Sequence, residues 1–542
     1  VAFPDYLDPE IPQLRDHKLS RRIEAEIALQ NGIKPGKYKL DQAKRILDNL
    51  QDKMIRYLEE EILKFDFKQN IGYLISHHDA LINKIRFVET KLEESKLRDI
   101  DFSRSKKSSS AKEDFNINIK DYQYIIEKFV QVNPNGKGIL NSHSFKFLVS
   151  LIDKINEIYS ASDNLHYEFF SVGLEIDPDF ILHVQYEEDI DNKQKIFYDE
   201  QTKFDLGLKG NKSDKISLTP IEYVLKEIDK AFYIDFEFCF SNMINVLKIM
   251  SGWPYYFNQR KERPFYFSTM EKIGDLAQKN IQDFDIDETE TIINFLTLKQ
   301  DGLLIIADEL DPAKDLPVWE KYKRPYRYPI RPLIKHNNNI FWGPHSTTQS
   351  GMIWLGGLLQ GRLPIKLNAP NVTETLKNFH AMLDNRLEEK AREIARRFTP
   401  YVENVDYSRG THPQEIGEFD ALVYLQEQNT LLNIECKNID TDFCIKDSRN
   451  TRRKIFRLEY EKERKVKNPG TLVIVEKRET WLRKNYSKFA DILNWPIKNN
   501  PRIISIFLTR EDFWWTKFPP RVTNVMFLRI DLLEETILSL TS

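Results

Sequence analysis

Apolar residues recur at spacings of three and four along residues 41–65, a pattern that predicts one amphipathic helix. The stripe consists of Ala43, Ile46, Leu47, Leu50, Met54, Leu58 and Ile62. Residues 71–97 show the same periodicity, and we expect them to form its antiparallel partner. Helical patterning resumes over residues 118–158, around an Asn133-Pro-Asn-Gly turn. The pattern therefore predicts a mostly helical N-terminal region.

Two segments interrupt this helical pattern. Residues 103–114 are polar and rich in serine, a composition typical of a flexible linker. Between residues 165 and 208 the apolar runs become short, at 180–184 and 196–198, and we expect them to form a small β insertion. Residues 220–295 return to helical periodicity, with a break at Gly252-Trp-Pro.

The middle of the chain leads into a C-terminal domain. Short apolar runs at 302–307 and 340–343 read as strands on either side of a proline- and arginine-containing stretch, 312–332. The glycine-spaced apolar segment 343–364 reads as a connection. We therefore expect a helical region with a β insertion over 1–210, a mainly helical middle region and connector over 211–365, and a domain over 366–542.

The C-terminal domain is expected to open with a helix over 372–397, capped by Asn371 or Thr373. At 100° per residue Glu388 falls on the border of the apolar stripe, whereas Glu389 and Glu393 point away. The stripe consists of Leu376, Phe379, Leu383, Leu387, Ala391, Ile394 and Phe398. Glu388 is therefore the carboxylate on this helix best placed to reach a buried site.

After this helix the pattern predicts strands and helices that build a mixed sheet flanked by helices. Strands are expected at 401–407, 417–425 and 431–437, then a charged helix at 446–465, a strand at 472–475 and a helix at 481–493. Strands at 502–508 and 522–528 complete the order. The predicted fold class is a multidomain α+β protein with a C-terminal α/β domain.

Three charged side chains stand out on the two consecutive strands at 417–425 and 431–437. Side chains alternate along a strand, so Glu435 and Lys437 share one face while Ile434 and Cys436 take the other. A short polar stretch between the runs predicts a hairpin, which would bring Asp420 near Glu435. Two carboxylates at one site suit a hard divalent cation such as Mg²⁺, and the lysine would then orient or activate a water.

Composition limits the classes of protein to consider. The chain has 542 residues, 41% of them hydrophobic, and a formal net charge of −3, so any nucleic-acid contact must come from a local basic patch. Its three cysteines are too few and scattered for a disulfide framework or a zinc site, which favours a reducing cytoplasm. No apolar run long enough for a membrane helix and no secretory signal layout are visible.

The helix predicted after the second strand carries far more basic than acidic residues. This surplus suits contacts to phosphate groups near the carboxylate pair. A solvated helix face with internal ion pairs explains any single residue equally well. The candidates for nucleic-acid binding are Arg449, Arg452, Arg453, Lys454 and Arg457.

These residues resemble the PD-(D/E)XK, or restriction-endonuclease-like, nuclease superfamily over residues 370–535. The family pattern is a helix glutamate, a strand aspartate and Glu-x-Lys on the next strand, matched here by Glu388, Asp420, Glu435 and Lys437. Phe419 stands where a proline often precedes the aspartate. The resemblance implies Mg²⁺- or Mn²⁺-dependent hydrolysis of a nucleic-acid phosphodiester. Asp420 and Glu435 would bind the metal, Lys437 would position the water, and Glu388 would be an auxiliary ligand.

Two functions remain open at this point. The first is a metal-dependent endonuclease, with DNA the expected substrate, that acts as effector of a bacterial defence or restriction system. Its N-terminal region would sense a signal or bind an activating partner, and we expect a homo-oligomer. The second is a catalytically silent nucleic-acid-binding or assembly protein that uses the nuclease fold as a scaffold.

Two further motifs indicate no second activity. Adjacent residues of His77-His78-Asp79 point about 100° apart on a helix, so we expect a surface or interhelix polar patch rather than a metal site. The segment Gly343-Pro-His-Ser fits neither a phosphate loop nor a nucleophile elbow.

Overall fold

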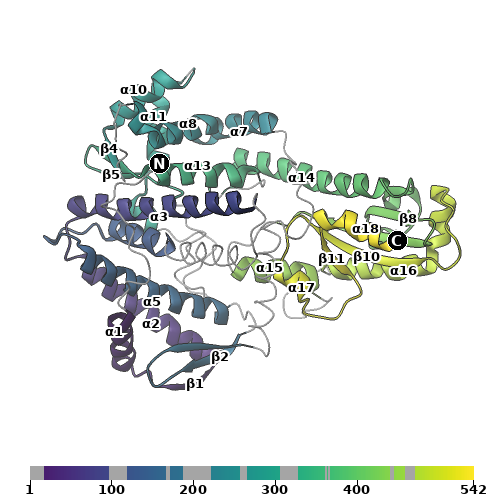
Figure 1. Cartoon of the computed structure of the whole chain (residues 1–542), viewed down its shortest axis with the longest axis horizontal. Helices are drawn as coiled ribbons and strands as arrows, with labels where there is room; N and C mark the ends of the chain where they lie inside the picture. The colour runs from purple at the N-terminus through teal and green to yellow at the C-terminus, as the bar shows by residue number, and fades with distance from the viewer. Residues whose placement is uncertain are drawn as a thin grey trace. The chain divides into compact units, whose positions relative to one another are not determined.

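A computed structural model describes residues 17–96, 119–166, 171–186, 221–256, 265–282, 284–304, 327–359, 363, 367–439, 445–457 and 470–541. These residues form two compact units, the first reaching residue 377 and the second running from residue 378 to the end (Figure 1). The serine-rich segment 103–114 and the expected strand at 196–198 lie outside the described residues. None of the described helices is both long and apolar enough to cross a membrane.

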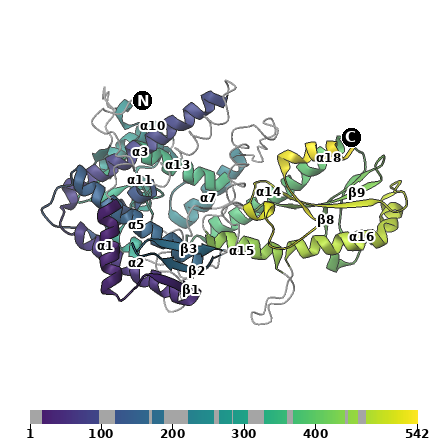
Figure 2. The ribbon, with the colours of Figure 1, turned by 60° about the horizontal axis from the view of Figure 1, so that its bottom comes forward.

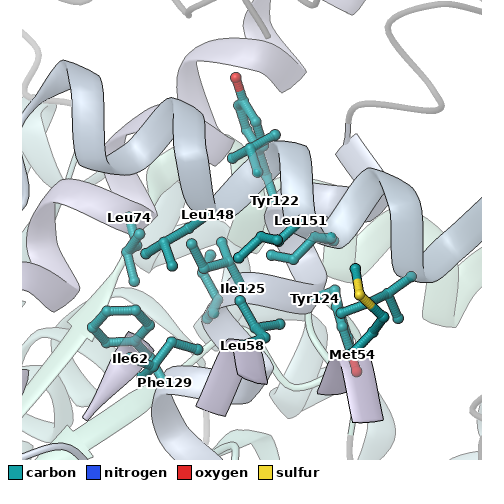
Figure 3. Close-up of a cluster of buried hydrophobic side chains, with 14 of the residues drawn as sticks. Met54, Leu58, Ile62, Leu74, Tyr122, Tyr124, Ile125, Phe129, Leu148 and Leu151 are labelled. Atoms are coloured by element: carbon teal, nitrogen blue, oxygen red, sulfur yellow. The ribbon is translucent and has the colours of Figure 1, made fainter. Parts of the chain in front are cut away.

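The first unit is built around a core of helices. Helix α2 (Leu40–Ile62) buries the predicted stripe residues Ala43, Leu47, Leu50, Met54, Leu58 and Ile62. It packs chiefly against α5 (Ser142–His166), and α1 (His17–Gln30) lies against both. Figure 3 shows side chains from α2, from α3 (Phe67–Lys96), from the 119–132 helix and from α5 gathered in this core. The expectation that residues 71–97 would be the main partner of the first helix is wrong, because α3 packs instead against α13 (Pro344–Leu359).

Two small antiparallel sheets accompany these helices. Strands β1 (Gly36–Lys39), β2 (Ser171–Ile176) and β3 (Leu182–Tyr186) form the first, in that order. The predicted β insertion is therefore present, and it recruits a strand from near the N-terminus. The second sheet has the order β4-β6-β5, with β4 (Tyr266–Ser268), β5 (Ile334–His336) and β6 (Asn339–Trp342).

The remaining part of the first unit is helical. Its helices are α7 (Ile221–Phe236), α8 (Phe240–Ser251), α9 (Trp253–Tyr256), α10 (Met270–Asn280), α11 (Ile286–Leu296) and α12 (Gln300–Leu304). Two expectations are wrong here. The run from Gly302 begins inside α12 instead of in a strand, and its residues beyond 304 lie outside the description. The supposed connection after Gly343 is helix α13, whose apolar residues pack against α3 and α8.

The second unit contains a five-stranded mixed sheet in the order β11-β10-β9-β8-β7. Strands β7 (Val402–Val405), β8 (Phe419–Leu425) and β9 (Thr430–Lys437) pair antiparallel. Strand β10 (Arg502–Thr509) runs parallel to β9, and β11 (Met526–Arg529) runs parallel to β10. The expected α+β class, with a mixed sheet near the C-terminus, is confirmed.

Helices cover both faces of this sheet. Helices α14 (Pro370–Arg396) and α18 (Leu533–Thr541) pack on one face through Leu387, Ala391 and Ile537. Helices α15 (Ile445–Phe456) and α16 (Thr471–Leu493) cover the other (Figure 2). Short helices complete the unit: η4 (Tyr407–Arg409), η5 (Gln414–Ile416), α17 (Trp514–Lys517) and η6 (Ile530–Leu532). The sheet is therefore the middle of three layers.

Two sequence-based expectations for residues 370–493 are wrong. Residues 472–475 form the start of α16 rather than a strand, because Leu472, Val475 and Leu482 are buried at helical spacing. Neither Asn371 nor Thr373 caps α14, because the helix begins at Pro370. The capping acceptor is Asp235 of α7, which accepts hydrogen bonds from the Val372 backbone nitrogen at 2.9 Å and from Asn371 Nδ2 at 2.7 Å.

Candidate metal-dependent nuclease site

The carboxylates of Asp420 and Glu435 come from two neighbouring strands at the centre of the sheet. On β9, Ile434 and Cys436 pack toward α14 and α18, while Glu435 contacts Arg478 of α16 on the opposite face. Lys437 lies two residues further on and contacts the same carboxylate. The prediction that Glu435 and Lys437 share a face is confirmed. Because β9 lies between β8 and β10, Glu435 is only 2% exposed.

A β-bulge aims the side chain of Asp420. Glu403 pairs with Leu422 and Val405 with Phe419, so β8 has one more residue than β7 across this interval. As a result Phe419 and Ala421, which a regular strand would place on one face, pack in clusters on opposite faces of the sheet. Asp420 lies between them, and its carboxylate bends toward the end of β9.

Contacts at the end of β9 join the two strands through charged groups. The backbone nitrogen of Cys436 donates to Asp420 Oδ2 at 2.7 Å. Lys437 Nζ lies 2.6 Å from Glu435 Oε1 and 3.9 Å from Asp420 Oδ2. Among the described residues, these contacts leave Asp420 Oδ1 without a partner. The predicted closeness of Asp420, Glu435 and Lys437 is confirmed.

Arg478 of α16 is the site residue that the sequence reasoning missed. Its Nη1 pairs with Glu435 Oε2, and its Nε donates to the Ile416 carbonyl at 2.9 Å. The guanidinium also lies over the Phe419 ring, 5.6 Å from the centroid. Only 5% of the residue is exposed. Both oxygens of Glu435 therefore contact a cation, Lys437 at Oε1 and Arg478 at Oε2.

Glu388 reaches the site from α14, where Leu387 and Ala391 are buried beside it. Its Oε2 lies 3.5 Å from Nη1 of Arg392, one turn further along the helix. The same Nη1 donates to the backbone oxygen of Asp420 at 2.7 Å. Arg392 therefore fastens the bulged residue of β8 to the helix that carries Glu388. Glu388 is thus linked to Asp420 through Arg392, and its role as an auxiliary metal ligand stays a prediction.

Burial and neighbouring charges act on these groups in different directions. Burial, and then the Glu435 charge, raises the pKa of Asp420 to about 7. Burial also opposes ionisation of Glu435, but Arg478 and then Lys437 outweigh it and lower the pKa of Glu435. Burial raises the pKa of Glu388, and Arg392 partly offsets this effect. Asp420 is therefore the weaker acid of the two.

Lys437 remains a cation in this surrounding. Desolvation opposes its charge, but the carboxylates of Glu435 and Asp420 outweigh that effect and raise the pKa of Lys437. Its side chain is 40% exposed, so the ammonium group can exchange a protein contact for solvent.

The loop before β8 is held in place by specific contacts. Gly417 adopts φ of +75°, a conformation that favours glycine, and a Cβ atom there would lie 3.0 Å from Arg478 Nη2. His412 Nε2 lies 2.6 Å from the Gly417 carbonyl, and the His412 ring packs against Phe419 and Phe489. The glycine therefore allows both the turn into β8 and the close approach of Arg478.

The basic candidates lie on or just after α15. Arg452, Arg453 and Arg457 are half-buried and Lys454 is exposed, while the side chain of Arg449 lies outside the described part. Ile455 and Phe456 pack with Ile439, two residues beyond Lys437. The basic helix is therefore anchored near the end of the strand that carries Glu435 and Lys437.

A second polar group in the first unit lies away from any surface. His77, His78 and Asp79 of α3 are 4%, 0% and 0% exposed, so of the two expected positions, surface or interhelix, the interhelix one is correct. Asp79 Oδ1 accepts from the Ser346 backbone nitrogen at 2.8 Å and thereby caps α13. His78 Nδ1 lies 3.1 Å from Ser346 Oγ. These contacts lock α3 to α13.

The donor set of the candidate site is rich in the oxygen ligands that a divalent cation requires. Glu388, Asp420 and Glu435 supply carboxylate oxygens, the ligands that Mg²⁺ and Mn²⁺ prefer. Asp420 Oδ1 has no hydrogen-bond partner among the described residues and is not one of their fully buried atoms, so a cation can reach it. No group of three or more such residues stands in ready metal-binding geometry among the described residues. The chemical type of these ligands therefore suits the ion. Lys437 contacts Glu435 Oε1, so the ion would have to displace the lysine from that oxygen.

Comparison with known proteins gives no matching family model, no matching curated protein and no matching solved structure.

Proposed function

We propose that the C-terminal unit hydrolyses nucleic-acid phosphodiester bonds with the help of a divalent cation. The observation that carries the proposal is the junction at the ends of β8 and β9, where Lys437 lies 2.6 Å from Glu435 and 3.9 Å from Asp420. Buried carboxylates that face one another repel, and a cation between them relieves the repulsion.

Each residue has a distinct part in the proposed reaction. Asp420 and Glu435 would hold Mg²⁺ or Mn²⁺, with Glu388 as an auxiliary ligand, and the bound ion would supply an activated water and neutralise charge on the phosphate. Lys437 would release Glu435 and place its ammonium group beside the developing negative charge, which stabilises the transition state. Arg392 keeps the Asp420 backbone fixed while this happens.

DNA is the proposed substrate, bound through the basic helix α15. Lys454 is exposed there, and Ile455 and Phe456 anchor the helix beside the strand end. Phosphate contacts from such a helix would position the backbone without reading sequence. The first unit, with a core of its own, would carry the sensing or partner-binding role of a defence or restriction effector.

One observation favours the alternative of a catalytically silent scaffold. Both oxygens of Glu435 already contact cationic side chains, so the network is balanced without a metal. A scaffold would keep this arrangement for stability and would bind nucleic acid without cutting it.

The test is Mg²⁺-dependent cleavage of supercoiled plasmid, single-stranded DNA and RNA by the full chain. We expect cleavage by the wild type that Asp420→Ala and Lys437→Ala abolish, while Glu389→Gln, which changes an exposed residue of α14, cleaves normally. Cleavage that survives both site substitutions would refute the assignment. No cleavage and no bound Mn²⁺ would instead favour the scaffold.

A further inference from the structure

Three carboxylates and three cations meet at the candidate site, but their oxygens are not equally available. Glu435 Oε2 is paired with Arg478, and Asp420 Oδ2 accepts the Cys436 backbone N–H at 2.7 Å. Glu388 Oε2 faces Arg392 at 3.5 Å. One oxygen of each carboxylate is therefore engaged by a group other than Lys437.

Arg478 and Lys437 differ in how firmly they are held. Besides Glu435, Arg478 contacts the Ile416 carbonyl and the Phe419 ring, and its side chain is 6% exposed. The side chain of Lys437 is 40% exposed and its contacts are with carboxylates alone among the described groups. An incoming ion can therefore displace Lys437 from Glu435 Oε1. Moving the buried Arg478 away from Glu435 Oε2 would disturb its contacts with Glu435, the Ile416 carbonyl and the Phe419 ring.

We infer that Arg478 permanently occupies one oxygen of Glu435 and thereby limits the site to a single divalent cation. This inference rests on the proposed function and specifies its metal requirement. Two-ion sites hold their metals about 3.5–4 Å apart, a distance that one carboxylate bridges when both of its oxygens are available. Here Oε2 of Glu435 is not available for sharing, and Oδ2 of Asp420 is already bonded to a backbone nitrogen.

Formal charge leads to the same result. With their carboxylates ionised, Glu388, Asp420 and Glu435 are balanced by Arg392, Lys437 and Arg478. One divalent ion together with a phosphodiester then leaves one uncompensated positive charge, whereas a second ion would leave three in a poorly solvated place. Arg478 is thus a positioning residue that acts through Glu435.

The experiment counts Mn²⁺ ions bound to the full chain by calorimetry and by electron paramagnetic resonance. We expect the wild type to bind one ion with the hyperfine pattern of an isolated Mn²⁺. Arg478→Met frees Oε2 and removes one positive charge, so it should bind two ions with an exchange-coupled spectrum. Arg478→Lys, which keeps a cation, should bind one.

Arg483→Met is the matched control, because Arg483 lies on the same helix, is 54% exposed and pairs with Glu479 at 2.6 Å. It should bind one isolated ion. Two ions in the wild type, or a single ion in folded Arg478→Met, would overturn the inference while leaving the proposed function intact. No bound ion in the wild type would overturn both. If Arg478→Met does not fold, the counts for the wild type and Arg478→Lys still decide between one ion and two.

Discussion

The backbone nitrogen of Cys436 donates to Asp420 Oδ2 at 2.7 Å, so the side chain of one strand takes the place of a backbone acceptor on its neighbour. The regular pairing of β8 with β9 extends only as far as Ala421 and Ile434. Beyond that pair, the hydrogen bond from the Cys436 backbone nitrogen to the Asp420 carboxylate joins the two strands. Asp420 therefore both holds the strand ends together and contributes a charge to the site.

Replacing Asp420 by asparagine should change how stability depends on pH. The folded pKa of Asp420, about 7, lies above the ordinary 3.8, so its contribution to stability is present below about pH 3.8 and is lost as pH rises from there to about 7. In metal-free buffer Asp420→Asn should therefore be more stable than the wild type at pH 8, by at least roughly 1.4 kcal/mol, the value of one pKa unit. The difference should shrink toward zero at pH 4.

Urea unfolding in EDTA across this pH range measures the effect. Glu435 does not obscure it, because a lowered pKa shifts its own transition below its ordinary value of 4.5. Equal stability of the two proteins at pH 8 would show that Asp420 ionises without cost in the folded chain.

Glu388→Gln should weaken metal binding, because it removes the auxiliary charge beside Asp420. We expect a loss of Mg²⁺ affinity on the order of ten- to hundredfold, similar to that for residues that support metal ligands. Glu389→Gln, one residue further along α14 and exposed, should leave affinity unchanged. Calorimetric titration with Mg²⁺ compares the two variants, and equal affinities would remove Glu388 from the site.

Arg392→Gln should destabilise the second unit, because it takes away the donor to the bulged Asp420 carbonyl. A buried carbonyl left without its donor costs about 1–3 kcal/mol. Thermal and urea unfolding should show this loss, while Arg396→Gln, which changes an exposed arginine one turn later, should not. A wild-type unfolding curve for Arg392→Gln would mean that the bulge does not depend on this contact.

Lys454→Ala should weaken DNA binding and lower its dependence on salt. Each phosphate contact that is lost reduces the slope of log affinity against log salt by about 1. Fluorescence anisotropy with labelled DNA at several salt concentrations provides the slope. Lys484→Ala, an exposed lysine of α16, is the control, and identical slopes for the two variants would argue against a phosphate contact at Lys454.

Local alternation was sufficient to predict the strands around Asp420 and Glu435 and the shared face of Glu435 and Lys437. Helical periodicity likewise predicted that Glu388 would lie at the half-buried border of its helix. These features depend on neighbours in the sequence, so a single chain reveals them. The β-bulge depends on how β8 pairs with β7, and no local pattern contains that information.

Arg478 was missed for a related reason. The run at 472–475 consists of apolar, mainly β-branched residues and was interpreted as a strand, so the helix was expected to start only at Trp481. Had the helix been started at Thr471, Arg478 would have fallen on its buried stripe, three residues after Val475. A charged residue in that position signals a buried ionic partner, which here is Glu435.

The burial of His78 and Asp79 could not be foreseen from their own helix. Their polarity left a surface and an interhelix position open, and Ser346 and the start of α13 supply the hydrogen bonds that allow the interhelix one. The partner is far away in sequence and lies in a segment that was itself interpreted as a connection.

Because of the bulge in β8, the position of the Asp420 carboxylate depends on the number of residues between Phe419 and Leu422. Deleting Ala421 would leave every acid and base of the site in the chain, yet it would make β8 and β7 equal in length across the interval from Phe419 to Leu422. Regular alternation would return, and the residue preceding Leu422 would be the aspartate itself. A related chain that lacks the residue at position 421 would keep the same acidic and basic residues in its sequence. In such a chain the aspartate carboxylate would no longer reach the backbone nitrogen of Cys436.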